Sequence, residues 1–391
     1  MRILQTSDNH IGETAYSRID MATGLNARGL DFLNSFKHTA DAAIKEKVDV
    51  FLIVGDFFTK VNPHPKYILE AIRKLKQVSR AGITSIIVSG NHETPRMVLT
   101  LNPLTLLGEI DGVHVALEPT SINVGDYDFV CVPAPPNFDE IHTLFEPLLI
   151  TALRNSRSEK RILATHIPIG QAVISSEVTL ESFVGENVDV SQIPPKFEYV
   201  ALGHMHKFQQ ITHDKMLIYY AGSSERYEFN EEHDDKYFLI VELDDKAEVT
   251  PIKLPTRKML TIVDGDCSGL SATEISRLIL DNIQKFGDTI ADALVRIKLE
   301  NIDVDQSGLI DWNEIKAQLC KAKVFDYKLQ PRTTVSLPES RGLEGDYILP
   351  PSKELEIYVM GKKEYRGKWR LLLKLGNEII KEAKEAEPSE A

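Results

Sequence analysis

Cysteine and long apolar runs are both scarce in this sequence, and each absence restricts the kind of protein that it encodes. Only three of the 391 residues are cysteines, and no two of them have the spacing of a metal site. A small, odd number of cysteines is typical of a reducing compartment, so we expect a cytoplasmic protein without disulfides. No apolar run approaches the roughly 20 residues that a membrane-spanning helix needs, and residues 1–5 resemble a first strand rather than a signal peptide. We therefore expect no membrane association.

An excess of positive charge is also absent. The chain has 45 Lys and Arg against 58 Asp and Glu, which gives a formal net charge of −13. Because contacts with phosphate groups require basic surface, this balance argues against tight DNA binding by the isolated chain. It does not exclude an enzyme that cleaves DNA, since two divalent cations would add about four positive charges where a phosphate must lie.

Residues 1–252 alternate strand and helix patterns, which predicts an α/β domain with mixed β-sheets packed between helices. The run 48–54 is almost continuously apolar, as expected of a strand that is buried on both faces. Helices are expected at about 30–47 and 66–79. Further strands are predicted at residues 3–8, 83–88, 129–132, 161–164, 199–202, 216–221 and 237–243.

Residues 253–338 predict a second, smaller α/β unit, which we call the capping domain. Ser271 and Glu274 have the spacing of a capping box before an apolar helical stripe. Residues 295–300 alternate like a half-buried strand. The other elements expected in this domain are a helix at 313–323 and a strand at 324–329.

Residues 303–314 fit the spacing of a calcium-binding EF-hand loop, with Gly308 at the sixth position and Glu314 at the twelfth. An EF-hand loop follows a helix, however, whereas the residues before this segment alternate like a strand. The alternative is an acidic turn that caps the helix after it. The sequence leaves both interpretations open.

The end of the chain has the pattern of a linker and a partner-binding helix. Residues 339–352 are rich in proline, glycine and charge, and residues 353–391 predict a helical segment with apolar residues at spacings of three and four. Residues 362–374 carry six Lys or Arg against one acidic residue. Because a helix after a linker has little of its own chain to bury against, docking on a partner or anionic surface is favoured over a solvated helix face.

Five short motifs of Asp, Asn and His each follow an apolar strand. Ligands gather at the carboxyl ends of strands in open α/β sheets, so five strand ends can place these side chains around one point. Nitrogen and oxygen donors together favour Mn²⁺, Fe²⁺ or Zn²⁺ over Ca²⁺ or Mg²⁺, and Asp56 is central enough to bridge two ions about 3.5–4 Å apart. Each motif alone is an ordinary turn, whereas all five in one chain predict a metal site. The candidate residues are Asp8, His10, Asp56, Asn91, His92, His166, His204 and His206.

The motifs also resemble those of a known family. The segments TSDNHIG, VSGNHETPR, YVALGHMHKFQ and YYAGSSERYEFNE resemble the calcineurin-like metallophosphoesterases. Within these enzymes, the segments look like the DNA double-strand-break repair nucleases that include bacterial SbcD and its archaeal and eukaryotic meiotic-recombination-eleven counterparts. The resemblance is strong over residues 1–252, extends to 253–338 in pattern only, and includes the tail by its placement.

This resemblance implies a function and a set of partners. It implies Mn²⁺-dependent hydrolysis of phosphodiester bonds, as a 3′–5′ exonuclease on duplex ends and an endonuclease on single-stranded or hairpin DNA. It further implies a prokaryotic, nucleoid-associated homodimer that works with an SMC-like coiled-coil ATPase of the SbcC type, bound through residues 353–391. One alternative is a small-diester or cyclic-nucleotide phosphodiesterase, although such an enzyme has little need of the residues beyond 252. Another is a structural tether, which would not need the converging metal donors.

The resemblance also implies a role for each site residue. One Mn²⁺ would bind Asp8, His10, Asp56 and His206, and the other would bind Asp56, Asn91, His166 and His204. His92 would lie beside both ions, where it steadies the phosphate or protonates the leaving oxygen. Many members have a second histidine three residues after the bridging aspartate, where this chain has Thr59. His64 lies nearby, but its proline neighbours favour an ordinary loop histidine.

Overall fold

The computed structural model describes residues 1–97, 99–173, 187–244, 247–334 and 369–386, together with Ser352, Leu355 and Val359. The chain divides into two units, Met1–Thr334 and Val335–Ala391. Among the described residues, no helix is both long and apolar enough to cross a membrane. The domain boundary at residue 252 stays a prediction, and the linker expected at 339–352 lies outside the described residues except for Ser352.

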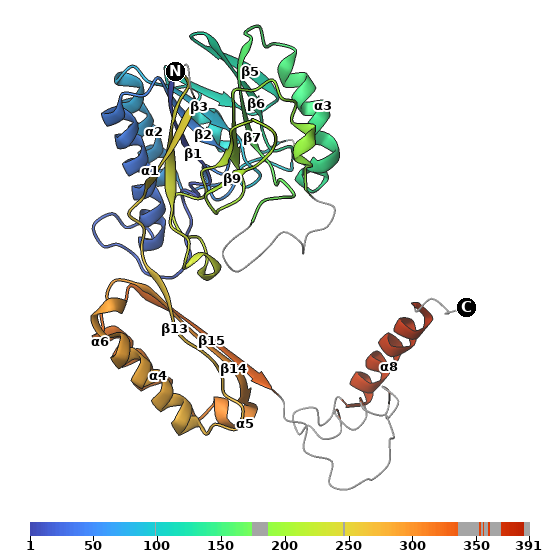
Figure 1. Cartoon of the computed structure of the whole chain (residues 1–391). Helices are drawn as coiled ribbons and strands as arrows, with labels where there is room; N and C mark the ends of the chain where they lie inside the picture. The colour runs from blue at the N-terminus through green and yellow to red at the C-terminus, as the bar shows by residue number, and fades with distance from the viewer. Residues whose placement is uncertain are drawn as a thin grey trace. The chain divides into compact units, whose positions relative to one another are not determined.

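The first of two six-stranded sheets has the order β12-β11-β1-β2-β3-β4. β1 to β4 are parallel, while β11 is antiparallel to β1 and β12 is antiparallel to β11. Helices α1 (Ala27–Glu46) and α2 (Pro65–Arg80) cover the outer face of this sheet (Figure 1). The strands are β1 (Arg2–Thr6), β2 (Val50–Val54), β3 (Thr84–Val88), β4 (Val113–Ala116), β11 (Tyr237–Glu242) and β12 (Glu248–Lys253).

The second sheet has the order β5-β6-β7-β8-β10-β9, and its four middle strands are parallel. Helix α3 (Ile141–Leu153) covers its outer face (Figure 1). The strands are β5 (Thr120–Val124), β6 (Tyr127–Val132), β7 (Lys160–His166), β8 (Tyr199–Gly203), β9 (Gln209–Ile211) and β10 (Ile218–Tyr220).

Short 3-10 turns occur at several places along the described chain, at η1 (Pro103–Leu106), η2 (Phe138–Glu140), η4 (Val190–Gln192), η5 (Phe229–Glu231) and η6 (Gly287–Ile290).

Alternation along β2 shows how the sheets and helices pack. Phe51 and Ile53 belong to the apolar cluster that includes α1 and α2, whereas Val50, Leu52 and Val54 belong to the cluster between the two sheets. All five side chains are fully buried, which explains why the sequence of this strand is apolar at every position. A third cluster joins the second sheet to α3. The layers are therefore helices, sheet, sheet and helix, and the predicted α/β fold with mixed sheets between helices is confirmed.

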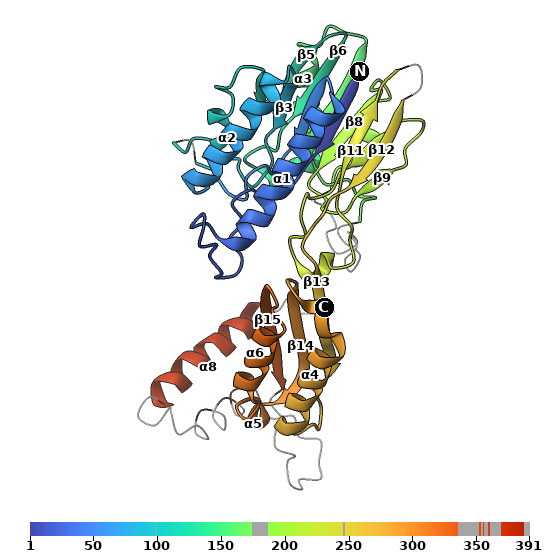
Figure 2. The same cartoon turned by 90° about the vertical axis from the view of Figure 1, so that its left-hand side faces the viewer.

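The part of the chain predicted as the capping domain folds as a smaller lobe, which runs from Met259 to Thr334. It is built on a parallel three-stranded sheet in the order β13-β14-β15. Helices α4 and α6 lie together on one face of this sheet (Figure 2). The predicted capping box is confirmed, because the Ser271 hydroxyl accepts from the Glu274 N–H and the Glu274 carboxylate accepts from the Ser271 N–H. The elements are β13 (Met259–Asp266), α4 (Ala272–Phe286), β14 (Leu294–Asp303), α5 (Val304–Ser307), α6 (Trp312–Lys321) and β15 (Asp326–Thr334).

The acidic segment 303–314 has the geometry of helix caps. β14 runs directly into Asp303, so a strand and not a helix precedes the segment. The Asp303 carboxylate accepts from the Asp305 N–H at 3.1 Å, and the Asp311 carboxylate accepts from the Glu314 N–H at 3.0 Å. These contacts support the capping turn rather than the calcium loop.

The helix predicted in the tail is present as α8 (Trp369–Ala386). Leu371, Leu375 and Ile379 are each spaced by four residues and are all exposed, so this helix presents an apolar stripe. Of the predicted basic stretch, residues 362–368 lie outside the described part of the chain.

Candidate metal centre

The candidate ligands from both sheets come together where five strands end. Asp8 and His10 follow β1, Asp56 follows β2, and Asn91 and His92 follow β3. His166 is the last residue of β7, while His204 and His206 follow β8. Within each of three groups the ligand atoms lie within 4.8 Å of one another. These groups are Asp8, His10 and His206; His10, Asp56 and His92; and Asp56, His166 and His204.

The backbone at this place adopts conformations that are unfavourable for side-chain-bearing residues. Asp8, His10, Asp56 and His204 have φ values of 48°, 43°, 46° and 98°, each of which costs on the order of 1–3 kcal/mol. The loops after β1 and β2 hold one another, because the His10 N–H donates to the Asp56 carbonyl oxygen at 2.9 Å. Such outliers gather at functional sites, where the surrounding fold maintains them.

The first group contains two imidazoles that face each other. The Nε2 atoms of His10 and His206 lie 3.0 Å apart, and Asp8 completes the group. The Nδ1–H of His206 donates to the Glu231 carboxylate at 2.7 Å. In its neutral form His206 therefore presents an unprotonated Nε2 to the site, as a metal-binding histidine must.

The second group brings a carboxylate oxygen and an amide oxygen together around one imidazole nitrogen. The Nδ1–H of His166 donates to the Val54 carbonyl oxygen at 3.2 Å, so Nε2 faces the site. That Nε2 lies 3.2 Å from Asp56 Oδ2 and 3.0 Å from Asn91 Oδ1. His204 Nδ1 lies 3.3 Å from the same Asn91 oxygen. A cluster of lone pairs of this kind requires a proton or a cation, so the donor set fits a divalent metal.

The pKa values of Asp56, His166 and His204 show that the buried carboxylate is stabilised by positive charge. Burial lowers the pKa of His166, but the Asp56 carboxylate outweighs burial and raises it to about 9. Burial likewise opposes ionisation of Asp56, yet His166 and the other imidazoles bring its pKa below the usual range. In contrast, burial and the neighbouring His166 lower the pKa of His204 to about 3. The Asp56 carboxylate is thus ionised, and His204 is neutral, as a metal ligand must be.

His92 differs from the proposed ligands by its exposure and its orientation. Its side chain is 38% exposed, and its Nε2 faces Asp56 Oδ2 at 3.8 Å. Its Nδ1 donates to the Thr59 carbonyl oxygen at 3.1 Å, and its backbone N–H donates to Asp56 Oδ1 at 2.9 Å. The imidazole therefore stands at the mouth of the site with Nε2 directed inward.

Thr59, at the position where the resemblance predicts a histidine in many members, does not direct its side chain at the candidate ligands. Its hydroxyl donates to Glu13 Oε2 at 2.9 Å, and the Tyr227 hydroxyl donates to the same oxygen at 2.7 Å. His64 is the N-cap residue of α2 and accepts from the Lys66 N–H. The interpretation of His64 as an ordinary loop histidine agrees with this contact.

Sequence reasoning missed several groups that surround the candidate ligands. Glu231 contacts His206, and the ring of Tyr227 lies 4.7 Å from that of His10. Glu93 is fully buried and accepts from the Gly90 N–H at 2.8 Å. Burial and the nearby Asp56 raise the pKa of Glu93 to about 8. Glu231 and Tyr227 lie in the segment YYAGSSERYEFNE that carries part of the resemblance, but in none of the five ligand motifs, so their place beside the candidate ligands is seen only from the spatial contact.

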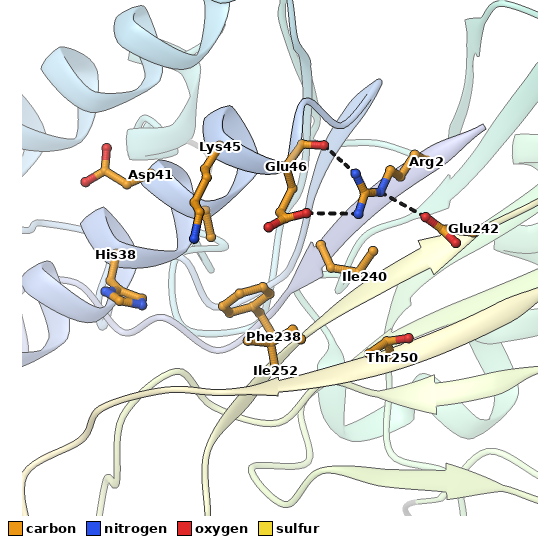
Figure 3. A pocket seen from close by; sticks show the side chains of 11 residues that line it. Arg2, His38, Asp41, Lys45, Glu46, Phe238, Ile240, Glu242, Thr250 and Ile252 are labelled. Carbon is orange, nitrogen blue, oxygen red and sulfur yellow. Dashed lines mark hydrogen bonds and ion pairs between the residues drawn. The ribbon is translucent and has the colours of Figure 1, made fainter.

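A separate pocket of about 460 Å³ lies between α1 and strands β11 and β12 (Figure 3). Arg2 lines it, so the pocket is at the opposite end of β1 from Asp8. The Arg2 guanidinium is held by Glu46 at 2.9 Å and by Glu242 at 3.0 Å. Because Glu46 and Glu242 both pair with Arg2 beside apolar side chains, this pocket lacks the converging carboxylate and imidazole groups that mark the candidate metal centre.

Comparison with known proteins places these features in a family. The profile of the calcineurin-like phosphoesterases matches residues 1–208. The DNA double-strand break repair protein Mre11 of Sulfurisphaera tokodaii is 30% identical over 224 residues, which are 57% of this chain and 53% of that protein. The Mre11 protein of Methanocaldococcus jannaschii is 25% identical over 374 residues, 91% of this chain and 94% of the relative.

A bacterial protein is similar to a comparable degree. The SbcD component of the nuclease SbcCD from Bacillus subtilis is 29% identical over 279 residues, 64% of this chain and 68% of the relative. The match spans about half the length of the Mre11 proteins from Sulfurisphaera tokodaii and Saccharolobus solfataricus. These similarities confirm the predicted resemblance to calcineurin-like phosphoesterases and, among them, to Mre11 and SbcD proteins.

Proposed function

Because the chain belongs to the calcineurin-like phosphoesterase family, we propose that it is the Mn²⁺-dependent DNA nuclease of a double-strand-break repair complex. In this proposal it acts as a 3′–5′ exonuclease on duplex ends and as an endonuclease on single-stranded or hairpin DNA. The substrate class follows from the relatives, which are named as DNA repair proteins and as a component of a nuclease. The observation that carries the proposal is the convergence of Asp56, Asn91 and His166 within hydrogen-bonding distance of one another, a donor set that fits a divalent cation.

Seven side chains would hold two Mn²⁺ ions, with Asp56 shared between them. The first ion would be held by Asp8, His10, Asp56 and His206, and the second by Asp56, Asn91, His166 and His204. The grouping of ligand atoms around Asp8 and around Asp56 supports this division. When bound, such a pair of ions stabilises charge on the phosphate and lowers the pKa of a bound water.

His92 would act on the phosphate rather than on the metals. Its Nδ1 proton is committed to the Thr59 carbonyl oxygen, so only Nε2 is available to a substrate. A proton on Nε2 would form a hydrogen bond to a phosphate oxygen or pass to the leaving oxygen. The exposure of the His92 side chain supports direct contact with the substrate.

The remainder of the chain would bind partners. We assign residues 1–252 to a nuclease domain, 253–338 to a capping domain that contacts DNA, 339–352 to a linker and 353–391 to a partner-binding segment. The exposed stripe of Leu371, Leu375 and Ile379 on α8 suits an apolar groove. An SMC-like coiled-coil ATPase of the SbcC type would supply that groove, and the nuclease would function as a homodimer.

The test is cleavage of hairpin-ended duplex DNA with Mn²⁺, with and without the ATPase partner and ATP. A small aryl phosphodiester is hydrolysed in parallel, because it needs the metals but no DNA-binding surface. The proposal expects wild-type protein to cleave both substrates and Asp56→Ala to cleave neither. Hydrolysis of the small diester without any DNA cleavage in the full complex would instead favour the small-diester phosphodiesterase.

A further inference from the structure

We propose that Glu231 is a positioning residue, which fixes the tautomer and the orientation of His206. The inference rests on the proposed role of His206 as a metal ligand. It adds a residue that lies 25 positions away in the chain and belongs to none of the five ligand motifs. Glu231 ends the short turn η5, at the edge of the candidate metal centre.

Both oxygens of the Glu231 carboxylate accept hydrogen bonds. One oxygen accepts from His206 Nδ1 at 2.7 Å. The other accepts from Lys236 Nζ at 2.5 Å and from the Tyr227 N–H at 3.0 Å. Lys236 also donates to the backbone carbonyl oxygen of His206 at 3.0 Å. The ammonium group therefore holds both the carboxylate and the backbone of the histidine that the carboxylate contacts.

These contacts decide which nitrogen of His206 is free. An ionised carboxylate only accepts hydrogen bonds, so His206 must carry its proton on Nδ1. In the neutral imidazole the lone pair is then on Nε2, which faces His10 Nε2 at 3.0 Å. A carboxylate behind a metal-binding imidazole also makes the imidazole a stronger donor.

The burial of Glu231 and Lys236 distinguishes this ion pair from an ordinary pair on the surface. Glu231 is 3% exposed and Lys236 is 1% exposed, and burying such a pair is expensive compared with apolar side chains of similar volume. Lys236 Nζ lies 2.5 Å from one oxygen of Glu231 and supplies the positive charge that stabilises the ionised carboxylate at this buried place. The charged carboxylate is therefore maintained at the place where a ligand must be oriented.

The turn that carries Glu231 is also held from the smaller lobe. The neighbouring Glu232 accepts a hydrogen bond from the Thr261 hydroxyl of β13 and forms an ion pair with Arg296 of β14 at 3.5 Å. Phe229, at the start of the turn, packs in a cluster with Met259 and Leu294. Fixed on both sides, η5 holds the carboxylate in a defined position relative to His206.

The test is calorimetric titration of Mn²⁺ into full-length wild-type protein and the variant Glu231→Gln. We expect the affinity of one of the two ions to fall by about 10–100-fold and the affinity of the other to stay unchanged. Glu225→Gln is the matched control, since Glu225 is a buried carboxylate of the same segment that contacts Arg28 and the Arg226 N–H. This control is expected to lower thermal stability but to bind Mn²⁺ like the wild type.

Two further measurements separate positioning from a merely structural role. The single variant His206→Ala and the double variant that carries both His206→Ala and Glu231→Gln should have the same Mn²⁺ affinity. This follows because the Glu231 carboxylate acts on the metal only through the His206 imidazole. Long-range ¹⁵N–¹H spectra of the metal-free wild type should show His206 protonated on Nδ1. Wild-type Mn²⁺ affinity in folded Glu231→Gln, or a neutral His206 that carries its proton on Nε2 instead of Nδ1, would overturn the inference. Absence of Mn²⁺ binding by the wild type would instead refute the proposed function.

Discussion

His92 is joined to Thr59 by a hydrogen bond from its Nδ1–H to the backbone carbonyl oxygen, at 3.1 Å. The bond uses the main chain of Thr59, so it does not depend on which side chain occupies that position. The Thr59 hydroxyl is turned toward Glu13 instead. The orientation of His92 is thus built into the loop after β2.

Replacement of His92 by glutamine should abolish cleavage while leaving the metals in place. Glutamine keeps polar atoms at the site but cannot carry a proton to the leaving oxygen, so we expect the turnover rate to fall by about 10²–10⁴-fold. Single-turnover cleavage of a DNA duplex and Mn²⁺ titration of the same preparation measure the two effects. Loss of a bound Mn²⁺ in this variant would show that His92 is a ligand.

Thr59→Ala is expected to have a much smaller effect than His92→Gln. The variant retains the carbonyl oxygen that accepts from His92 and loses only the hydroxyl bond to Glu13, worth about 0.5–1.5 kcal/mol. The rate of DNA cleavage should stay within a few-fold of the wild-type value. A rate as low as that of His92→Gln would mean that the threonine side chain itself takes part in cleavage.

Asp56→Ala should remove both metals at once. Asp56 contacts His166 at 3.2 Å, and its ligand atom groups with those of His10 and His204, so the two proposed sites share it. We expect Mn²⁺ affinity to fall by on the order of 100-fold or more at both sites. His204→Ala is the comparison, because it should weaken one site and spare the other. Degradation of linear DNA at the wild-type rate by Asp56→Ala would show that the proposed site is wrong.

The positions of many strands along the chain, and the candidate ligands at their ends, could be predicted from the sequence because apolar runs and the short motifs that follow them are local in the chain. The apolar run at 48–54 corresponds to β2, and the motif residue Asp56 follows that strand directly. Glu231 could not be found in this way. Its contact with His206 depends on where η5 lies in space, and Lys236 is buried although lysine is almost always exposed. Contacts between side chains distant in the chain leave no periodic pattern to read.

Asp128 should make the stability of the protein depend on pH in the acid range. Burial raises its pKa, but hydrogen bonds from the Ser158 N–H, Asn123 and the Arg157 N–H lower it more. The unfolded chain has a pKa near 3.9, so the stabilisation is complete above that value and is lost as pH falls toward the folded value. Asp128→Asn should lower the free energy of unfolding by about 1–3 kcal/mol at pH 7.

Denaturant unfolding of the wild type and Asp128→Asn at several pH values checks this expectation. The difference between the two proteins should be constant from pH 7 to about pH 5 and should shrink below about pH 4. Mn²⁺ affinity should be the same in both, because the carboxylate of Asp128, the second residue of β6, bonds to Asn123, Ser156, Arg157 and Ser158 and to no candidate ligand. A difference that grows as pH falls would contradict the assigned direction of the pKa shift.

Replacement of Arg257 should impair cleavage of DNA but not hydrolysis of small phosphodiesters. Its guanidinium binds both oxygens of Asp31 at 2.7 Å and lies 3.6 Å from the centre of the Phe325 ring. It therefore joins α1 of the larger domain to the residue preceding β15 of the smaller lobe. Arg257→Ala should loosen the lobe that is proposed to contact DNA, while the metal ligands keep their positions.

For this variant we expect kcat/KM on duplex DNA to fall by up to about 100-fold, as expected when a long substrate is misplaced by an ångström. Hydrolysis of a small aryl phosphodiester should be unchanged, because that substrate needs only the metals and His92. Lys253→Ala is the control, since Lys253 is an exposed cation that pairs with Asp235 at 2.7 Å. Equal losses on both substrates would mean that Arg257 supports the metal centre itself, and the smaller lobe would then have no separate role in holding DNA.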